Sequence, residues 1–220
     1  MCGRFMLSKS TPDLVSRFGI IEVIADMIPR YNISPSQPIW VVREERVRIM
    51  EPMQWGMVPF WARERGSGVI NARMESLTEK PTFKQAFRRK RCLIPADGFY
   101  EWRSTNGVKR PFLFRLKDGE LFAFAGLWDE WTSPDGSPLR SCAIITVPPN
   151  ALLAKIHNRM PAILSAEDEN RWLDEGANPA AGDLLSLLAP YPPEKMEMIP
   201  VSNKVNNPRY EGPECMEQAE

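Results

Sequence analysis

The second residue of the chain is a cysteine, and this position gives it chemistry that an internal cysteine lacks. Initiator methionine is commonly removed when residue 2 is small, which leaves Cys2 with a free α-amine and a thiol on adjacent carbons. Because an α-amine has a pKa of about 7.7–8, a useful fraction is unprotonated at neutral pH and can attack an aldehyde. The thiol can then close onto the imine carbon to form a five-membered thiazolidine. The alternative, commoner for an arbitrary protein, is a free thiol on a mobile terminus.

Three polar residues are candidates to assist such a nucleophile. His157 is the only histidine of the chain, and histidine is the usual acid or base near neutral pH. Glu101 is a single carboxylate in an apolar and aromatic run, where burial would raise its pKa and suit it for proton transfer. Asn71 has an amide that can hydrogen-bond a reacting sugar oxygen. Each has a structural alternative: a lone histidine is more often structural, a strand glutamate more often faces solvent, and an asparagine as readily caps a turn.

Arginines and aromatic residues are interleaved in a pattern that suits a single nucleic-acid strand, because bases stack on rings and phosphates pair with cations. The candidate phosphate contacts are Arg4, Arg73 and Arg159, and the candidate stacking groups are Phe60, Trp61 and Trp102. The alternatives are surface charges for the arginines and core packing for the aromatics. The dense basic run at residues 84–91 is interpreted as a solvated helix end rather than a DNA contact.

The elements that must position these residues follow an α+β pattern of mostly antiparallel strands with short peripheral helices. Residues 38–50 predict a hairpin, and further strands are expected at 91–94, 98–102, 111–116, 121–128 and 140–147. Turns are expected at Asn106-Gly107, Asp118-Gly119 and Asp135-Gly136. Helices are expected at 11–18, in two pieces within 75–89, at 165–174 and at 183–188. On an alternating strand, Glu101 would share a face with Phe99 rather than with Trp102.

Composition indicates an ordinary globular protein. The length of 220 residues suits one domain or at most two, with a core large enough to need no disulfide or metal. The four cysteines are too irregularly spaced for a disulfide framework or a zinc site, and the start of the chain lacks the apolar stretch of a signal peptide. We therefore expect a cytoplasmic protein, nucleoid-associated when on DNA, with no metal, no cofactor and no membrane segment.

Charge is distributed unevenly although the net charge is zero. Residues 1–120 hold 21 Lys+Arg and 13 Asp+Glu, whereas residues 121–220 hold 7 and 15. Such asymmetry favours an anionic partner at the basic part. The alternative is that the two parts neutralise each other in the fold, and charge alone does not separate these interpretations.

Several short motifs together resemble the SOS-response-associated peptidase (SRAP) family, also called YedK-like or HMCES-like abasic-site processing proteins. The motifs lie at residues 1–5 (MCGRF), 30–35 (RYNISP), 55–59 (WGMVP), 70–75 (INARME), 92–102 (CLIPADGFYEW), 124–128 (FAGLW) and 157–161 (HNRMP). Val201-Ser202 and Val205-Asn206 match near the end. The resemblance runs in order from residue 2 to about residue 207.

This resemblance implies one domain with a β-rich, barrel-like centre, assigned to residues 1–210. The segment after Tyr210 is short and acidic, and we expect a disordered tail at 211–220. It implies that Cys2, once Met1 is removed by self-cleavage or an aminopeptidase, forms a crosslink with the aldehyde of an abasic site in single-stranded DNA. In the family pattern Glu101 shuttles protons, His157 assists ring opening and Asn71 orients the sugar or the amine. Arg4, Arg73 and Arg159 match phosphate-contacting positions.

The same resemblance places Trp61 and Trp102 near the DNA kink. Some relatives have two tryptophans where this chain has Phe60-Trp61, so an altered preference among junctions of single-stranded and double-stranded DNA is expected. The protein is expected to act as a monomer.

Two other functions compete with covalent capture of abasic sites. Cys2, His157 and Glu101 superficially form a thiol–imidazole–carboxylate set, which a peptidase or amidohydrolase would use. A non-catalytic DNA-binding module would bind intact and abasic strands alike. That function ranks last because a basic groove alone does not require cysteine at position 2.

Overall fold

The computed structural model describes residues 2–174, 176 and 179–219. Its strands are β1 Phe5–Leu7, β2 Glu22–Val23, β3 Arg30–Ile33, β4 Pro38–Glu44, β5 Arg48–Trp55, β6 Asn71–Arg73, β7 Arg91–Ala96, β8 Gly98–Thr105, β9 Val108–Leu116, β10 Phe122–Thr132, β11 Pro138–Val147, β12 Met160–Pro161, β13 Ile163–Leu164 and β14 Met196–Pro200. Its α-helices are α1 Thr11–Phe18, α2 Pro81–Arg89, α3 Ala166–Leu173 and α4 Ala181–Ser186. The predicted α+β class is confirmed.

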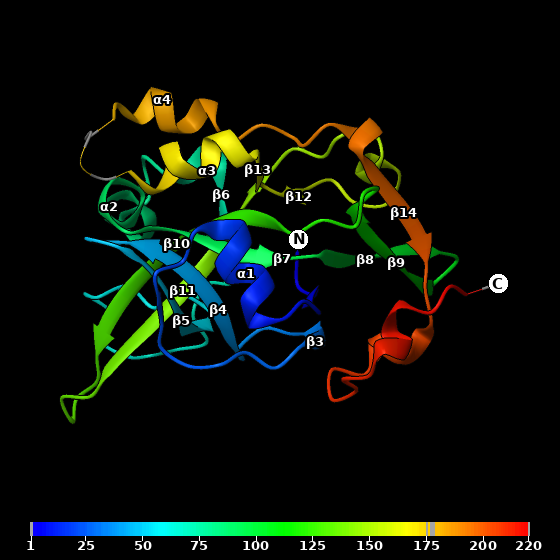
Figure 1. The fold of residues 1–220 in the computed structure, drawn as a ribbon, viewed down its shortest axis with the longest axis horizontal. Helices are drawn as coiled ribbons and strands as arrows, with labels where there is room; N and C mark the ends of the chain where they lie inside the picture. Colours follow the sequence, from blue (N-terminus) through cyan, green and yellow to red (C-terminus); the bar gives the residue numbers. More distant parts are fainter. Residues whose placement is uncertain (1, 175, 177–178, 220) are drawn as a thin grey trace.

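Within the described residues the strands form two sheets that share one core. A five-stranded antiparallel sheet has the order β14-β9-β8-β1-β3. A nine-stranded sheet has the main path β12-β11-β10-β7-β4-β5-β2, and its parallel pairings are β2 with β5, β5 with β11, and β6 with β11. Helices α2, α3 and α4 gather on one side of these sheets, and the C-terminal segment lies beside β9 and β14 on another (Figure 1).

Aromatic rings join the two sheets at their centre. Phe5 of β1 packs edge-on against Trp55 of β5 and Phe124 of β10, with ring centroids 5.2 and 5.7 Å apart. Phe99 of β8 contacts Phe124 as well, at 6.0 Å. These rings are buried, and burying such large apolar side chains is a major stabilising contribution. The core therefore fixes β1, and with it the start of the chain, between the two sheets.

Several helices and turns begin at the capping and turn residues of the sequence. The N–H of Asp168 donates to the Ser165 hydroxyl at 3.2 Å, which caps the start of α3. Asn106 and Gly107 have φ of 50° and 80°, which is the backbone of a tight β8–β9 turn. Pro81 does not break a helix but opens α2, where its missing N–H has no intrahelical partner to lose.

Two expectations are corrected by tertiary contacts. Within the basic run, Arg88 and Arg89 are exposed as expected, but Arg91 is buried and donates to the backbone carbonyls of Trp172 and Asp174. Residues 211–219 also do not form the expected disordered tail. They contain a 3₁₀ helix, Pro213–Met216, whose Cys215 is fully buried.

The acidic segment is held by specific contacts that its composition does not reveal. Glu211 accepts from the Asn32 backbone N–H at 2.9 Å and from Arg30 Nε at 2.7 Å. Cys215 packs with Tyr100 and Val205 in a second, smaller apolar cluster. The described residues contain no helix long and apolar enough to cross a membrane.

Deleting residues 211–220 should lower the stability of the fold. Removal exposes the apolar cluster around Tyr100 and leaves the Asn32 N–H without its acceptor. The free energy of unfolding measured in urea should therefore fall by roughly 2–4 kcal/mol. A disordered tail would contribute nothing, and an unchanged urea midpoint would therefore contradict the packing of this segment. Substituting Glu120, an exposed residue outside this segment, serves as the control.

Candidate functional site

Cys2 lies inside the protein rather than on its surface. Its side chain is 0% exposed, and its carbonyl accepts a hydrogen bond from Asn71 Nδ2 at 2.8 Å. Asn71 is itself buried at the start of β6, where β11 pairs with it in parallel register through Ile144. Burial raises the pKa of the Cys2 thiol far above its usual range, and the nearby Glu101 charge raises it further. The thiol is therefore protonated at neutral pH.

Asn71 keeps one unused group beside Cys2. Its Oδ1 is buried and accepts no hydrogen bond from any described residue. An unpaired buried acceptor is costly, and such groups commonly mark a place where a donor arrives. An amine or a hydroxyl beside Cys2 is a donor of the right kind.

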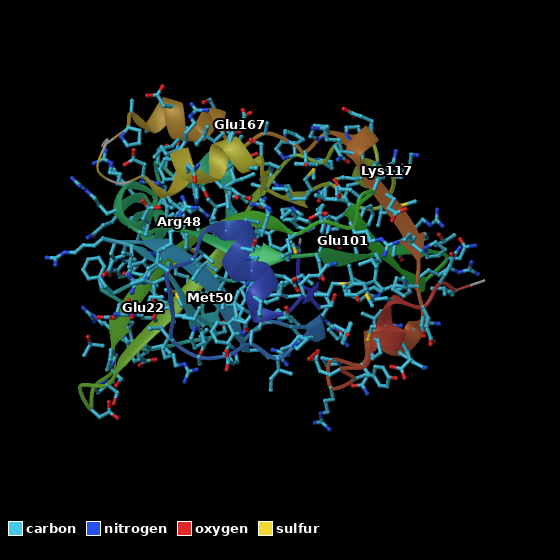
Figure 2. All side chains as sticks on the ribbon, in the orientation of Figure 1. Glu22, Arg48, Met50, Glu101, Lys117 and Glu167 are labelled. Atoms are coloured by element: carbon cyan, nitrogen blue, oxygen red, sulfur yellow. The ribbon has the colours of Figure 1, made fainter. Side chains whose placement is uncertain are left out.

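Glu101 is the acidic group of the site. It lies on β8 opposite Phe112 of β9, and Figure 2 shows it near the middle of the molecule. As expected from the alternation of the strand, it is on the face of Phe99, whose ring is in the core. Glu101 is 5% exposed, and burial raises its pKa to about 7. A carboxyl group with this pKa can both donate and accept a proton near neutral pH.

His157 approaches from a different part of the chain. It follows the 3₁₀ helix Leu153–Lys155, and its backbone N–H donates to the Leu153 carbonyl at 2.9 Å. The Arg159 backbone N–H donates to His157 Nδ1 at 3.0 Å, so the neutral imidazole carries its proton on Nε2. Burial lowers the pKa of His157, which keeps the ring neutral at pH 7.

A cavity of about 510 Å³ brings several of the predicted residues together. Its lining consists of Arg4, Glu101, Trp102, Lys109, His157 and Asn206. Cys2 and Asn71 do not line it, but the Glu101 charge acts on the Cys2 thiol. The cavity thus brings together a buried carboxyl group, whose pKa is about 7, and a neutral imidazole.

Arg4 and Trp102 are held by residues of two sequence motifs to which the sequence assigned no role, Asn32 and Val205-Asn206. Arg4 Nη1 donates to Asn32 Oδ1 and to the Val205 carbonyl, both at 2.6 Å, and its guanidinium lies 5.7 Å from the centre of the Trp102 ring. Trp102 Nε1 donates to Asn206 Oδ1 at 2.6 Å. The Val205-Asn206 motif was the available signal for these contacts.

Arg73 and Arg159 are brought to one place by three strands. Thr146 of β11 is opposite Arg73 of β6 and also opposite Pro161 of β12. Arg159, which precedes β12, therefore lies near Arg73. Arg73 is exposed, whereas Arg159 forms two hydrogen bonds with the Glu75 carboxylate at 2.6 and 3.0 Å. A phosphate that approached this fork would therefore compete with Glu75.

Phe60 and Trp61 are exposed on the loop that follows β5, with 48% and 52% of their surface accessible. Gly56 and Gly68 close the base of this loop: a Cβ at Gly68 would lie 2.2 Å from the Gly56 carbonyl oxygen. The Phe60 N–H donates to Asp129 Oδ2 at 2.9 Å, which anchors the loop. Neither ring is among the described residues that line the cavity, so the structure leaves these two apart from the catalytic candidates.

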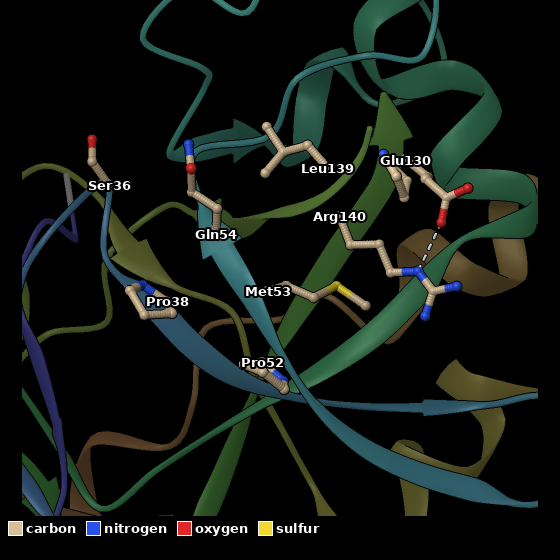
Figure 3. A pocket seen from close by; sticks show the side chains of 9 residues that line it. Ser36, Pro38, Pro52, Met53, Gln54, Glu130, Leu139 and Arg140 are labelled. Carbon is tan, nitrogen blue, oxygen red and sulfur yellow. Dashed lines mark hydrogen bonds and ion pairs between the residues drawn. The ribbon is translucent and has the colours of Figure 1, made fainter. Parts of the chain in front are cut away.

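Another cavity, of about 480 Å³, lies between β5 and β11 (Figure 3). Its Arg140 is already paired with Glu130 at 2.8 Å and with Glu51 at 2.7 Å. None of its described lining residues is a cysteine or a histidine. Residues 2–174, 176 and 179–219 also contain no group of three or more His, Cys, Asp or Glu side chains that could hold a metal ion.

Comparison with known proteins gives consistent matches over the whole chain. The family model described as SOS response associated peptidase (SRAP) matches residues 1–208. The chain is 42% identical over 226 residues to the abasic site processing protein YoqW of Bacillus subtilis (strain 168), covering 99% of both. It is 35% identical over 222 residues to the abasic site processing protein HMCES of Xenopus tropicalis, covering 86% of this chain and 65% of that protein.

A solved structure has the same fold. The crystal structure of a protein from Bacteroides thetaiotaomicron superimposes with a TM-score of 0.90 at 27% identity, covering 100% of both chains.

Replacing Glu101 by glutamine should change how stability depends on pH. The carboxyl ionises near pH 4.5 when unfolded and near 7 when folded, so rising pH between these values favours the unfolded wild type. The stabilisation lost by pH 8 is at most about 3 kcal/mol. Glu101→Gln has no carboxyl at this position and does not lose this stabilisation. The difference between its Tm and that of wild type should therefore increase by several degrees from pH 4 to pH 8.

The Glu64→Gln variant is the control for this experiment, because it makes the same substitution at an exposed position outside the site. A pH-independent difference for Glu101→Gln would mean that Glu101 ionises in the folded protein as it does in water.

Proposed function

The chain belongs to the SOS response associated peptidase (SRAP) family, and from this premise we propose that it processes abasic sites by bonding covalently to them through Cys2. The observation that carries the proposal is the hydrogen bond from Asn71 to the Cys2 carbonyl, which belongs to a fully buried second residue beside Glu101. A terminus is ordinarily frayed and exposed. A buried one supports a chemical role for the group at residue 2.

The proposed reaction starts after hydrolysis of the Met1–Cys2 peptide bond, by the protein itself or by an aminopeptidase. The Cys2 α-amine attacks C1′ of the ring-opened abasic sugar, and loss of water gives a Schiff base. The thiol then adds across the C=N bond: sulfur bonds to carbon, and the proton ends on nitrogen. The product is a thiazolidine that contains both groups of Cys2.

The raised pKa of the Cys2 thiol favours this order of steps over a hydrolase mechanism. A thiol peptidase needs a thiolate, which low-pKa sites near cations or helix N-termini supply. Burial of Cys2 and then the Glu101 charge raise the pKa of its thiol, and together they outweigh the lowering by the positive amino terminus. The amine is thus the first nucleophile, and the neutral thiol acts once the imine carbon is available.

The surrounding residues have complementary proposed roles. Glu101 moves protons between the amine and the sugar, because its pKa of about 7 allows both directions. His157 Nε2–H donates a hydrogen bond to the sugar ring oxygen and so polarises it for ring opening, since Nδ1 is already engaged. Asn71 Oδ1 is the unpaired acceptor that would orient the amine or a sugar hydroxyl.

The proposed substrate is single-stranded DNA with an abasic site, including junctions with duplex, bound by a monomer in the cytoplasm. The phosphates would be contacted by Arg4, Arg73 and Arg159. A phosphate of the strand would replace the Glu75 carboxylate as the partner of Arg159. Trp102, Phe60 and Trp61 would stack on bases. The missing base leaves a gap, so no nucleotide has to be flipped out.

Covalent capture is tested by incubating the purified protein with an abasic single strand and running a denaturing gel. Wild type should give a heat-stable shifted band, and Cys2→Ala should give none while still binding the strand. Cys142→Ala is the matched control, because this other fully buried thiol lies away from the cavity. An equally stable band from Cys2→Ala would overturn the proposal, and intact mass measures the loss of Met1 in each sample.

The rate of crosslinking should also depend on Glu101. In Glu101→Gln the proton relay is absent, so the rate should fall by roughly 100- to 10,000-fold. In wild type the rate should rise through about pH 7 as the carboxylate forms and the amine loses its proton. An unchanged rate for Glu101→Gln in a single-turnover assay would remove this residue from the mechanism.

A further inference from the structure

The β8–β9 hairpin carries an unneutralised cluster of cations beyond the candidate site. Residues 102–116 contain four cations and no acid. Arg115 pairs with Glu197 at 2.6 Å, whereas Arg103, Lys109 and Arg110 are exposed and form no ion pair with any described residue. The hairpin therefore presents three unpaired positive charges near its tip.

The strand register places two of these charges directly against each other. Arg103 of β8 is opposite Arg110 of β9, and like charges in this relation destabilise a sheet. No described acid relieves the repulsion. An anion bound from outside would relieve this repulsion.

The two arginines continue the face of the site. Arg103 lies two residues after Glu101, so it is on the same face and about 7 Å further along the strand. The Arg103 guanidinium lies 4.6 Å from the centre of the Phe112 ring, and Phe112 is the partner of Glu101 across the ladder. Stacking on a ring fixes the plane of a guanidinium and leaves its N–H edge for an oxyanion.

Two surface cavities lie beside this cluster of cations. A cavity of about 460 Å³ is lined by Arg103, Arg110, Phe112 and residues of the C-terminal part, and one of about 550 Å³ lies at the hairpin tip. On the other face, Lys109 lines the site cavity itself. Cations therefore line cavities on both faces of the hairpin, with Arg103 and Arg110 at the two cavities beyond the site and Lys109 at the site cavity.

We propose that Arg103 and Arg110 form a second phosphate-binding surface, which holds the DNA strand that flanks the lesion. This inference rests on the proposed function, because it assigns the partner as the same strand whose abasic site reaches Cys2. Arginine forks match phosphate oxygens in geometry, and such contacts position a strand without reading its sequence. The surface would add affinity for long strands and leave the chemistry at the lesion unaffected.

The test compares Arg103→Gln/Arg110→Gln with wild type on single strands of about 5 and about 20 nucleotides, in a Cys2→Ala background for equilibrium binding. Removing two phosphate contacts should lower the slope of log K against log salt by about 1.4 on the long strand. When salt is raised from roughly 50 to 200 mM, the factor by which wild-type affinity falls should therefore be about seven times the factor by which the affinity of the variant falls. Binding of the short strand should be unchanged.

The matched control is Arg88→Gln/Arg89→Gln, which removes two exposed arginines from α2 on the opposite side of the molecule (Figure 1). Its salt slope on the long strand should equal that of wild type. The Tm of the hairpin variant should not fall, because the substitution removes a repulsion. Equal slopes for the hairpin variant and wild type, an equal effect on short strands, or the same effect from the α2 variant would each overturn the inference.

The design separates this inference from the proposed function. Crosslinking of the short abasic strand by proteins that retain Cys2 tests the function alone, and the hairpin variant should crosslink it as wild type does. A wild type that binds long strands through the hairpin but never crosslinks would overturn the function and support the inference.

Discussion

Burial of residue 2 is the constraint on which the rest of this structure depends. The Asn71 side chain holds the Cys2 carbonyl, and three residues later Phe5 is already in the core between both sheets. Ordering the start of a chain costs conformational entropy, which the packing of the first strand offsets. A first strand that was paired only at an edge would not keep Cys2 in one place.

The same burial sets the electrostatics of the site. Removing Glu101 from water raises its pKa to about 7, and its charge together with burial keeps the Cys2 thiol protonated. His157 remains neutral because burial lowers its pKa. One cause, desolvation, thus shifts the pKa of three titratable groups in the directions that the proposed amine-first chemistry requires.

The C-terminal segment completes the site from the other end of the chain. Val205 and Asn206 hold Arg4 and Trp102, and Asn32 links Arg4 to the backbone carbonyls of Asn207 and Tyr210. Glu211 in turn accepts from the Asn32 N–H. Part of the negative charge of residues 121–220 is therefore used within the fold, while Arg103 and Arg110 of the first part stay unpaired. Neutralisation within the fold therefore accounts for part of the charge asymmetry, and an anionic partner for the unpaired arginines stays a prediction.

Sequence by itself determined what depends on local chemistry. Strand alternation predicted that Glu101 shares the face of Phe99, turn residues predicted the β8–β9 hairpin, and short motifs predicted the family. These signals work because backbone preferences and side-chain alternation act within a few residues. They do not determine burial, so the exposure of Glu101 remained open between a proton shuttle and a solvent-facing residue.

Only the tertiary structure decided which distant residues meet. The engagement of Arg159 by Glu75, the burial of Arg91 and the order of the acidic C-terminal segment all contradict or extend what composition suggested. Each depends on a partner far away in the sequence: Glu75 for Arg159, the carbonyl of Trp172 for Arg91 and the N–H of Asn32 for Glu211. The free energy of a charged side chain is set by its partner and its distance from water, and these exist only once the chain has folded.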